Sequence, residues 1–312
     1  VVPKNRFGAG HIIHTGSSAH VEALEMRARS KGLSLATMEH ASEQEVYSAL
    51  DLPYFPPERR DGGLDTEGLA DLVAFDDVRG MVHVHSTYSD GRDSIEALAL
   101  EADRRGVEYL TITDHSPSAF YAQGVVIDNL KRQWDEIAVV QEKVKVKLLR
   151  GTESDINADG SLDYPDAILE QMDVVIASIH SRHQMDADAM TDRLVRAMKH
   201  PVYKIWGHAL GRLVLKRDPI RCDMDAVLDA IASSRAAIEV NGDPYRLDLA
   251  PEWIPAARKR KIPFVISVDA HSAAAFSVLR FGVWMARRGG LTKSEVLNTR
   301  GVDAFKAAVR PS

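Results

Sequence analysis

The chain contains Met81-Val82-His83-Val84-His85, a short apolar run with histidines at alternate positions. Five later apolar runs also end on residue types that bind metal ions. These runs end on His115, Glu153, His180, His208 and the pair Asp269 and His271. Short apolar runs of this kind are typical of buried strands in a parallel sheet. Strands that end in this way would bring their last side chains together at one rim of a barrel.

Helical segments separate the apolar runs, and this alternation indicates parallel β-α-β units. A further run over residues 237–241 brings the number of expected strands to seven. The expected helices include residues 94–105, 128–144, 187–199, 224–233 and 251–260. Seven strands are one fewer than a complete (β/α)8 barrel contains. We therefore predict an α/β fold, a distorted (β/α)7 barrel, preceded by a small α+β module.

Candidate metal ligands with nitrogen and oxygen donors gather at the predicted rim. They are His83, His85, Asp90, His115, Glu153, His180, His208, Asp269 and His271. His83 and His85 are one residue apart on a strand, so both side chains point to the same face. A catalytic zinc ion uses about three protein ligands, so this set suggests two or three divalent ions. We expect Mn²⁺, Zn²⁺ or Fe²⁺, because mixed imidazole and carboxylate sites accept each of them.

Such a site predicts a metal-dependent phosphoric ester hydrolase. The expected nucleophile is a metal-bridged hydroxide, because metal ions make a bound water acidic and neutralise phosphate oxygens. We identify no catalytic side chain. Arg182, Arg212 and Arg246 lie near rim loops and are candidates for binding the substrate phosphate through forked hydrogen bonds. For Arg212 and Arg246, an ordinary scaffold salt bridge is an equally good interpretation.

The positions of the histidines favour a metal site over isolated structural roles. One histidine at a strand end is more often a hydrogen-bonded structural residue than a ligand. Here six of the twelve histidines lie at or beside the ends of apolar runs, which random placement would not produce. The other histidines are interpreted as structural or surface residues. Among them, His20 is expected to be solvated, and His11 and His14 to face opposite ways on a strand.

Charge and cysteine content limit the partners. The net charge of -6 disfavours tight binding of long duplex DNA, which usually requires a basic face. A DNA 3′ end, single-stranded DNA or a small phosphate ester remains compatible with this charge. Cys222 is the only cysteine, so we expect no internal disulfide and a reducing compartment. We find no membrane-spanning run and no signal peptide in residues 1–6, and therefore expect a cytoplasmic protein without membrane binding.

The first part of the chain has a different pattern. We expect a small module over residues 1–52, with a strand at Gly10–His14 and a helix at Ala19–Lys31. Ser42-Glu43-Gln44-Glu45 resembles a capping box and predicts a second helix. Several prolines and the pair Gly62-Gly63 then interrupt the chain, so we interpret residues 53–77 as a linker. Residues 78–312 form the predicted metal-binding domain.

The rim motifs resemble, in order, those of the PHP (polymerase and histidinol phosphatase) superfamily. The motifs are His83-Val84-His85 through Asp90-Gly91, Thr113-Asp114-His115-Ser116, Gly151-Thr152-Glu153, Ser178-Ile179-His180-Ser181, Gly207-His208 and Asp269-Ala270-His271. The resemblance covers about Val78 to Val309 and includes all nine ligand positions. It implies a distorted seven-stranded barrel with a trinuclear metal site.

Two further stretches resemble the C-terminal PHP domain of bacterial and archaeal family X DNA polymerases. They are residues 207–219 and 244–249. Residues from Arg6-Phe7-Gly8 to Tyr47 resemble the end of that polymerase, its thumb region. This resemblance implies hydrolysis of DNA 3′ ends, as a 3′-5′ exonuclease or 3′-end processing enzyme of DNA repair. The catalytic aspartates of the polymerase palm have no counterpart in these residues, so we expect no polymerase activity from this chain.

Two other functions remain open. A small-molecule phosphatase of the histidinol-phosphate type agrees with the acidic net charge, although the thumb-like remnant argues against it. A catalytically silent structural or regulatory PHP domain is the second alternative, and the complete set of nine ligands argues against that. The sequence predicts neither the oligomeric state nor which of the possible metals is bound.

Overall fold

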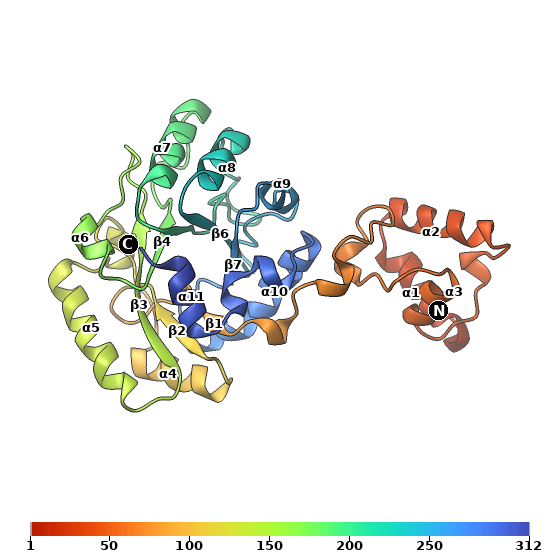
Figure 1. Cartoon of the computed structure of the whole chain (residues 1–312), viewed down its shortest axis with the longest axis horizontal. Coiled ribbons are helices and arrows are strands. Elements are labelled where there is room, and N and C mark those ends of the chain that lie inside the picture. The colour runs from red at the N-terminus through yellow and green to blue at the C-terminus, as the bar shows by residue number, and fades with distance from the viewer. Residues whose placement is uncertain (1, 312) are drawn as a thin grey trace. The chain divides into compact units, whose positions relative to one another are not determined.

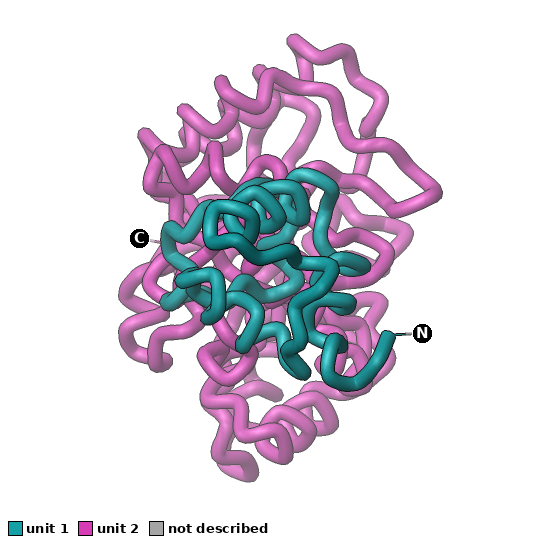
Figure 2. Tube along the Cα trace, turned by 90° about the vertical axis from the view of Figure 1, so that its right-hand side faces the viewer, with its two compact units in different colours: residues 1–72 teal, residues 73–312 magenta. Residues whose placement is uncertain are grey.

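The structure is a computed structural model that describes residues 2–311. The chain divides into two compact units, one ending at Leu72 and one beginning at Val73 (Figure 2). The boundary falls inside the segment predicted as a linker, residues 53–77, whose first part belongs to the first unit. Each unit encloses its own cluster of buried apolar side chains.

The first unit is helical over the residues that the structure describes. Its α-helices are α1 (Phe7–Thr15), α2 (Ser18–Ser30) and α3 (Glu43–Ala49), and its 3₁₀ turns are Lys4–Arg6, Leu35–Thr37, Pro57–Arg59 and Leu69–Asp71. The strand predicted at Gly10–His14 is therefore wrong, and the module is not α+β over residues 2–72. The buried residues Ala9 and Ile12 have helical spacing. Gly8 lets α1 approach α3 closely, because a Cβ there would lie 2.2 Å from the Ser42 carbonyl oxygen.

The two helices predicted in this unit are present as α2 and α3, but the predicted environment of His20 is wrong. Glu45 and Ser42 form the expected capping box, in which the Glu45 N–H donates to Ser42 Oγ over 3.3 Å. His20, expected to be solvated, is fully buried. Its Nε2 lies 2.8 Å from the Tyr47 hydroxyl and its Nδ1 lies 3.1 Å from the Gly63 carbonyl oxygen. The position of His20 in the first turn of α2 faces the core rather than solvent.

The second unit is a barrel-like sheet of seven parallel strands in sequential order, with helices around the outside (Figure 1). The strands are β1 (Gly80–Met81), β2 (Tyr109–Ile112), β3 (Lys147–Asp155), β4 (Val174–Ser178), β5 (Lys204–Trp206), β6 (Ala236–Asn241) and β7 (Phe264–Ser267). The α-helices are α4 (Ile95–Arg104), α5 (Ile127–Gln141), α6 (Asp166–Leu169), α7 (Ala187–Lys199), α8 (Met224–Ala232), α9 (Ile254–Lys259), α10 (Leu279–Arg288) and α11 (Val302–Val309). The predicted (β/α)7 barrel is confirmed. Among the described helices, none has the length and apolar character needed to cross a bilayer.

The barrel closes between its two edge strands without an eighth strand. Beyond the ends of β1 and β7, the His85 N–H donates to the Ala270 carbonyl over 2.8 Å, and the Ala270 N–H to the His83 carbonyl over 3.0 Å. Near the start of β1, the buried Asn298 amide donates to the carbonyls of Gly80 and Ile266 over 3.0 and 2.7 Å. Edge groups that would otherwise remain unpaired are thereby satisfied.

Candidate metal centre

All nine predicted ligand residues lie at the carboxyl ends of the strands in the second unit. Glu153 lies within β3, and the others follow β1, β2, β4, β5 or β7. Because the strands run parallel, these positions share one rim of the barrel. Seven of the nine side chains are at most 7% exposed, while Asp90 and His271 are 32% and 35% exposed. The rim therefore combines a buried interior with one side open to solvent.

A first cluster contains His83, His85, Glu153 and Asp269, whose donor atoms lie within 4.8 Å of one another. The Nε2 atom of His85 is 3.0 Å from Asp269 Oδ1, and that of His83 is 3.4 Å from the same oxygen. His83 Nε2 is also 3.4 Å from Glu153 Oε2. Two imidazoles and two carboxylates therefore converge on one buried point.

A second cluster lies on the open side and contains His85, Asp90, His115 and His271, again within 4.8 Å. Asp90 Oδ1 lies 3.2 Å from His271 Nε2 and 3.6 Å from His115 Nε2. His85 belongs to both this cluster and the first, because its two ring nitrogens face in different directions. The segment after β1 thus contributes His83 and His85 to the first cluster and His85 to the second.

Glu153 connects these clusters to a third one, formed with His115 and His180. Its Oε2 atom lies 3.0 Å from His115 Nδ1, and its Oε1 atom lies 3.2 Å from His180 Nε2. His208 Nε2 is 2.7 Å from the same Oε1 atom. The two oxygens of this carboxylate therefore face different imidazoles, His180 and His208 at Oε1 and His83, His85 and His115 at Oε2, an arrangement in which it could bridge two cations.

Several buried donor atoms of this set have no hydrogen-bond partner among the described residues. They are Nε2 of His83, both ring nitrogens of His85, Nδ1 of His115, Oε2 of Glu153, Nε2 of His180, Nδ1 of His208 and Oδ1 of Asp269. Buried polar side-chain atoms in native proteins are mostly paired, so such a concentration is unusual. Imidazole nitrogens and carboxylate oxygens are the ligands that zinc and similar ions take. The donor set therefore fits divalent cations.

The charges at the rim favour a cation as well. Burial, together with the neighbouring His115, lowers the pKa of His85 to about 3. Burial alone would also lower the pKa of His180, but Glu153 and Asp155 raise it to about 9. The pKa of Glu153 stays well below its usual value despite complete burial, because four imidazoles surround it. The ionised carboxylates therefore create a field that attracts positive charge.

Glu239 supports the centre, although no role was predicted for it from the sequence. It is fully buried in the middle of β6, and its Oε1 accepts a 2.6 Å hydrogen bond from His83 Nδ1. Its Oε2 accepts from the His208 backbone N–H over 2.6 Å and from Asn241 over 3.1 Å. Carboxylates that hold the far nitrogen of a histidine commonly orient metal ligands. In the sequence, the presence of a glutamate inside the apolar run 237–241 is the signal that indicates a role for Glu239.

Asp155 plays the same part for His180. Its Oδ1 lies 2.6 Å from His180 Nδ1, which leaves Nε2 directed toward Glu153. Asp155 lies two residues after Glu153 on β3, so both side chains point to the same face of the strand. No role is predicted for Asp155 from the sequence, where its alternate spacing from Glu153 is the signal for one.

The three arginines proposed as phosphate ligands differ in their surroundings. Arg246 Nε donates to Asp269 Oδ2 over 2.8 Å, and its Nη1 is buried without a hydrogen-bond partner among the described residues. Arg212 instead donates to the backbone carbonyls of Arg246 and Leu247. Arg182 is exposed and follows His180 closely in the loop after β4. Of the three, Arg246 therefore offers a donor beside the candidate ligands.

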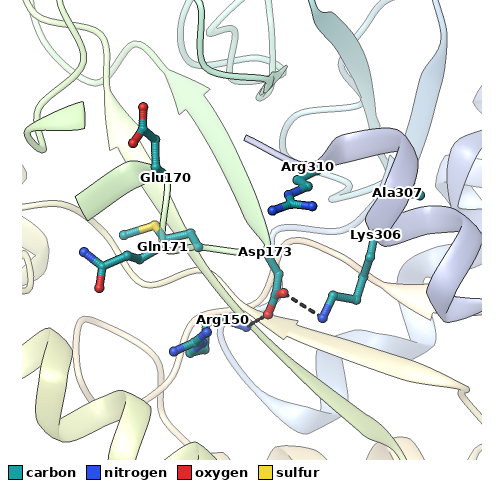
Figure 3. Close-up of a pocket in the computed structure, with 8 residues that line it drawn as sticks. Arg150, Glu170, Gln171, Asp173, Lys306, Ala307 and Arg310 are labelled. Atoms are coloured by element: carbon teal, nitrogen blue, oxygen red, sulfur yellow. Dashed lines mark hydrogen bonds and ion pairs between the residues drawn. The ribbon is translucent and has the colours of Figure 1, made fainter. Parts of the chain in front are cut away.

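A pocket of about 500 Å³ lies near the amino ends of β3 and β4 and does not include the metal centre (Figure 3). Arg150, Glu170, Asp173, Lys306 and Arg310 contribute to its lining. Its charged groups are partly engaged with each other, since Lys306 Nζ lies 2.9 Å from Asp173. The Arg150 N–H also donates to Asp173 over 2.9 Å. None of the nine ligand residues lines this pocket.

Comparisons with known proteins agree with this geometry. The family described as PHP domain matches residues 82–243, and the DNA polymerase beta thumb matches residues 11–61. A Bacillus subtilis (strain 168) protein named DNA polymerase/3'-5' exonuclease PolX is 36% identical over 273 residues. That match covers 86% of this chain but only 48% of the relative, so the chain spans about half of that protein's length.

Other proteins match a smaller share of this chain and are covered over most of their own length. A protein named "Probable phosphatase" from Thermoanaerobacter sp. (strain X514) is 31% identical over 233 residues, covering 70% of this chain and 89% of the relative. A crystal structure of histidinol phosphate phosphatase from Lactococcus lactis, complexed with zinc, L-histidinol and phosphate, aligns with a TM-score of 0.47 and 17% identity. It covers 67% of this chain and 93% of that one. The chain belongs to the PHP domain family of metal-dependent phosphoesterases and carries a DNA polymerase beta thumb region before its barrel.

Proposed function

We propose that the chain hydrolyses DNA 3′ ends, as a 3′-5′ exonuclease or a 3′-end processing enzyme. The observation that carries this proposal is the convergence of nine imidazole and carboxylate side chains at one rim, with unpartnered donor atoms facing each other. The choice of DNA is supported by the thumb region at residues 11–61 and by the name of the Bacillus subtilis relative. Residues 78–312 would form the hydrolytic domain and residues 1–52 a thumb-derived module.

The nine side chains are proposed to hold two or three divalent ions, with Mn²⁺, Zn²⁺ and Fe²⁺ as candidates. Such ions would supply an acidic water and neutralise phosphate charge. The protein's own groups fix the geometry: Glu239 and Asp155 hold His83 and His180 with their Nε2 atoms turned toward the site. Arg246 can offer its Nη1 donor to a substrate oxygen while its Nε keeps hold of Asp269.

A small-molecule phosphatase is the second candidate function. It is favoured by the probable phosphatase of Thermoanaerobacter, because this chain covers 89% of that protein. The open side of the centre, next to Asp90 and His271, would admit a small ester as readily as a polynucleotide end. A silent regulatory domain is the third candidate, and the complete ligand set argues against it.

One experiment separates these functions. The whole chain is reconstituted with Mn²⁺ or Zn²⁺ and incubated with a labelled single-stranded oligonucleotide and, separately, with histidinol phosphate. Successive shortening from the 3′ end supports the proposal, and phosphate release from the small ester alone supports the phosphatase. Metal binding without turnover of either substrate would contradict both and favour a silent domain. The His83→Ala variant should lose activity, whereas His14→Ala, which alters an exposed residue of α1, should not.

A further inference from the structure

Exposed aromatic side chains lie on the loops that surround the candidate metal centre. Phe120 and Tyr121 are 87% and 66% exposed in the turn between β2 and α5. Tyr245, in the loop after β6, is 63% exposed. Both loops follow the carboxyl ends of strands, as do the candidate metal ligands. Exposed apolar groups gathered at one place commonly mark a binding surface.

The first of these loops is firmly anchored although its aromatic rings are exposed. Ala119 and Ala122 are fully buried on either side of the two aromatic residues. Ser118 donates through its N–H and its hydroxyl to Asp163 over 2.7 and 2.6 Å. The exposure of Phe120 and Tyr121 is therefore set by a fixed backbone.

Tyr121 places this anchored loop directly beside the metal centre. Its ring centroid lies 6.0 Å from that of His115 and 6.1 Å from that of His180. Phe120 precedes it in the same 3₁₀ turn and is more exposed. A polynucleotide strand that enters the metal centre beside His115 would therefore pass the rings of Phe120 and Tyr121.

Tyr245 belongs to a second part of the rim and has a lysine beside it. Its carbonyl accepts from the Val214 N–H over 2.7 Å, which joins the loops after β5 and β6. Lys216 Nζ lies 5.0 Å from the centre of the Tyr245 ring. The loops after β4, β5 and β6 carry six arginine and lysine residues, Arg182, Arg212, Lys216, Arg217, Arg221 and Arg246, together with six acidic residues. Lys216 thus places one positive charge beside the Tyr245 ring, where the phosphate backbone of a stacked strand would approach.

We propose that Phe120, Tyr121 and Tyr245 are stacking platforms for the bases of a single-stranded polynucleotide whose terminal phosphodiester lies at the metal centre. This inference rests on the proposed function, and it identifies the residues that favour a polynucleotide over a small phosphate ester. Aromatic rings interleaved with basic groups are how proteins bind single strands without reading their sequence. A small ester without bases cannot use these platforms.

Binding is measured separately from turnover to test the inference. Fluorescence anisotropy gives the Kd of the metal-loaded chain for a labelled oligothymidylate with non-hydrolysable terminal linkages, and for the same strand with abasic 3′-terminal positions. Phe120→Ala and Tyr245→Ala should each weaken binding of the complete strand about tenfold, as expected for the loss of one base–aromatic contact. Both should change binding of the abasic strand much less. Phe120→Leu should behave like Phe120→Ala, because it keeps an apolar side chain but removes the ring.

Trp284→Ala is the matched control, because Trp284 is 48% exposed on α10 rather than on these rim loops. Equal affinity for the complete and abasic strands, or unchanged affinity in both alanine variants, would overturn the inference. Tight base-dependent binding without strand shortening would contradict the proposed hydrolysis of DNA ends and leave the stacking platforms supported. Strand shortening that neither Phe120→Ala nor Tyr245→Ala affects would support the proposed hydrolysis of DNA ends and contradict the stacking platforms.

Discussion

Two fully buried histidines, His20 in the first unit and His85 in the barrel, show what distinguishes a structural imidazole from a candidate ligand. Both ring nitrogens of His20 have partners, the Tyr47 hydroxyl and the Gly63 carbonyl. Neither ring nitrogen of His85 has a hydrogen-bond partner among the described residues. Burial alone therefore says little about function, whereas a buried donor atom without a partner points to a missing ligand.

Two glutamates, the largely covered Glu43 and the fully buried Glu153, differ in the same way. Glu43 accepts from the Arg60 guanidinium through both oxygens, over 2.6 and 2.9 Å, as expected for a structural ion pair. Glu153 lies beside imidazole nitrogens and the Asp269 carboxylate, and its Oε2 atom lacks a hydrogen-bond partner among the described residues. In the first unit, the charge of Glu43 is thus paired with that of Arg60. At the barrel rim, the Glu153 carboxylate has an oxygen without a hydrogen-bond partner, which a bound cation would pair.

The largest effect should come from removing a shared ligand. We expect His85→Ala to lower kcat/KM for phosphoester hydrolysis by more than the roughly 100-fold that loss of a supporting residue costs. Circular dichroism should show a folded protein. Bound metal, measured by mass spectrometry, should fall by about one equivalent or more. If His85→Ala kept full activity and metal content, the contrast between His85 and His20 would have no functional meaning.

A smaller loss is expected from Glu239→Gln. The amide keeps the shape of the side chain but removes the negative charge that orients His83. Metal affinity from competition with a chelating dye should fall about 10- to 100-fold, as for other supporting carboxylates. Glu43→Gln serves as the control, because it makes the same change in the first unit, outside the barrel. Equal loss of metal affinity in both variants would show that the effect is not local.

Chelation should separate the two units. Ligand binding at about 100 times Kd stabilises a folded state by about 2.7 kcal/mol, so removing metal should destabilise the barrel by a similar amount. Hydrogen exchange followed by mass spectrometry should show loss of protection around β1, β3 and β7 after EDTA treatment. The helices α1, α2 and α3 should keep theirs. Equal deprotection of both units would contradict a metal site confined to the barrel.

The smallest effect concerns pH. Burial lowers the pKa of His20 below its usual 6.5, and the positive charge of Arg60 lowers it further, while the Gly63 carbonyl acts in the opposite direction. The unfolded chain therefore binds the proton more readily, so this contribution to stability is complete above pH 6.5 and is lost as pH falls through the folded-state pKa. Unfolding of wild type and His20→Gln, compared across this range, should reveal a difference on the order of 1 kcal/mol. A pH response that survives His20→Gln would assign it to another group.

The barrel and eight of the nine rim residues can be predicted from the sequence because both follow from where apolar runs end, and Asp90 follows in the loop after the first run. The role of Glu239 cannot be predicted in this way, because Glu239 lies inside β6 and not at the end of an apolar run. The short apolar run Ile12-Ile13 predicts a strand at residues 10–14, which lie in α1 instead. Their helical state depends on packing of Gly8 and Ala9 against the segment around Ser42, which short-range patterns do not report. The partners of His20 are likewise distant in sequence, at Tyr47 and Gly63.

The most direct test of the central claim is anomalous X-ray scattering from crystals of the chain grown with Mn²⁺ or Zn²⁺. We predict two or three anomalous peaks at the barrel rim, within bonding distance of Glu153, His85 and the other candidate ligands, and none beside His20. Peaks elsewhere, or a rim without anomalous density at saturating metal, would contradict the account.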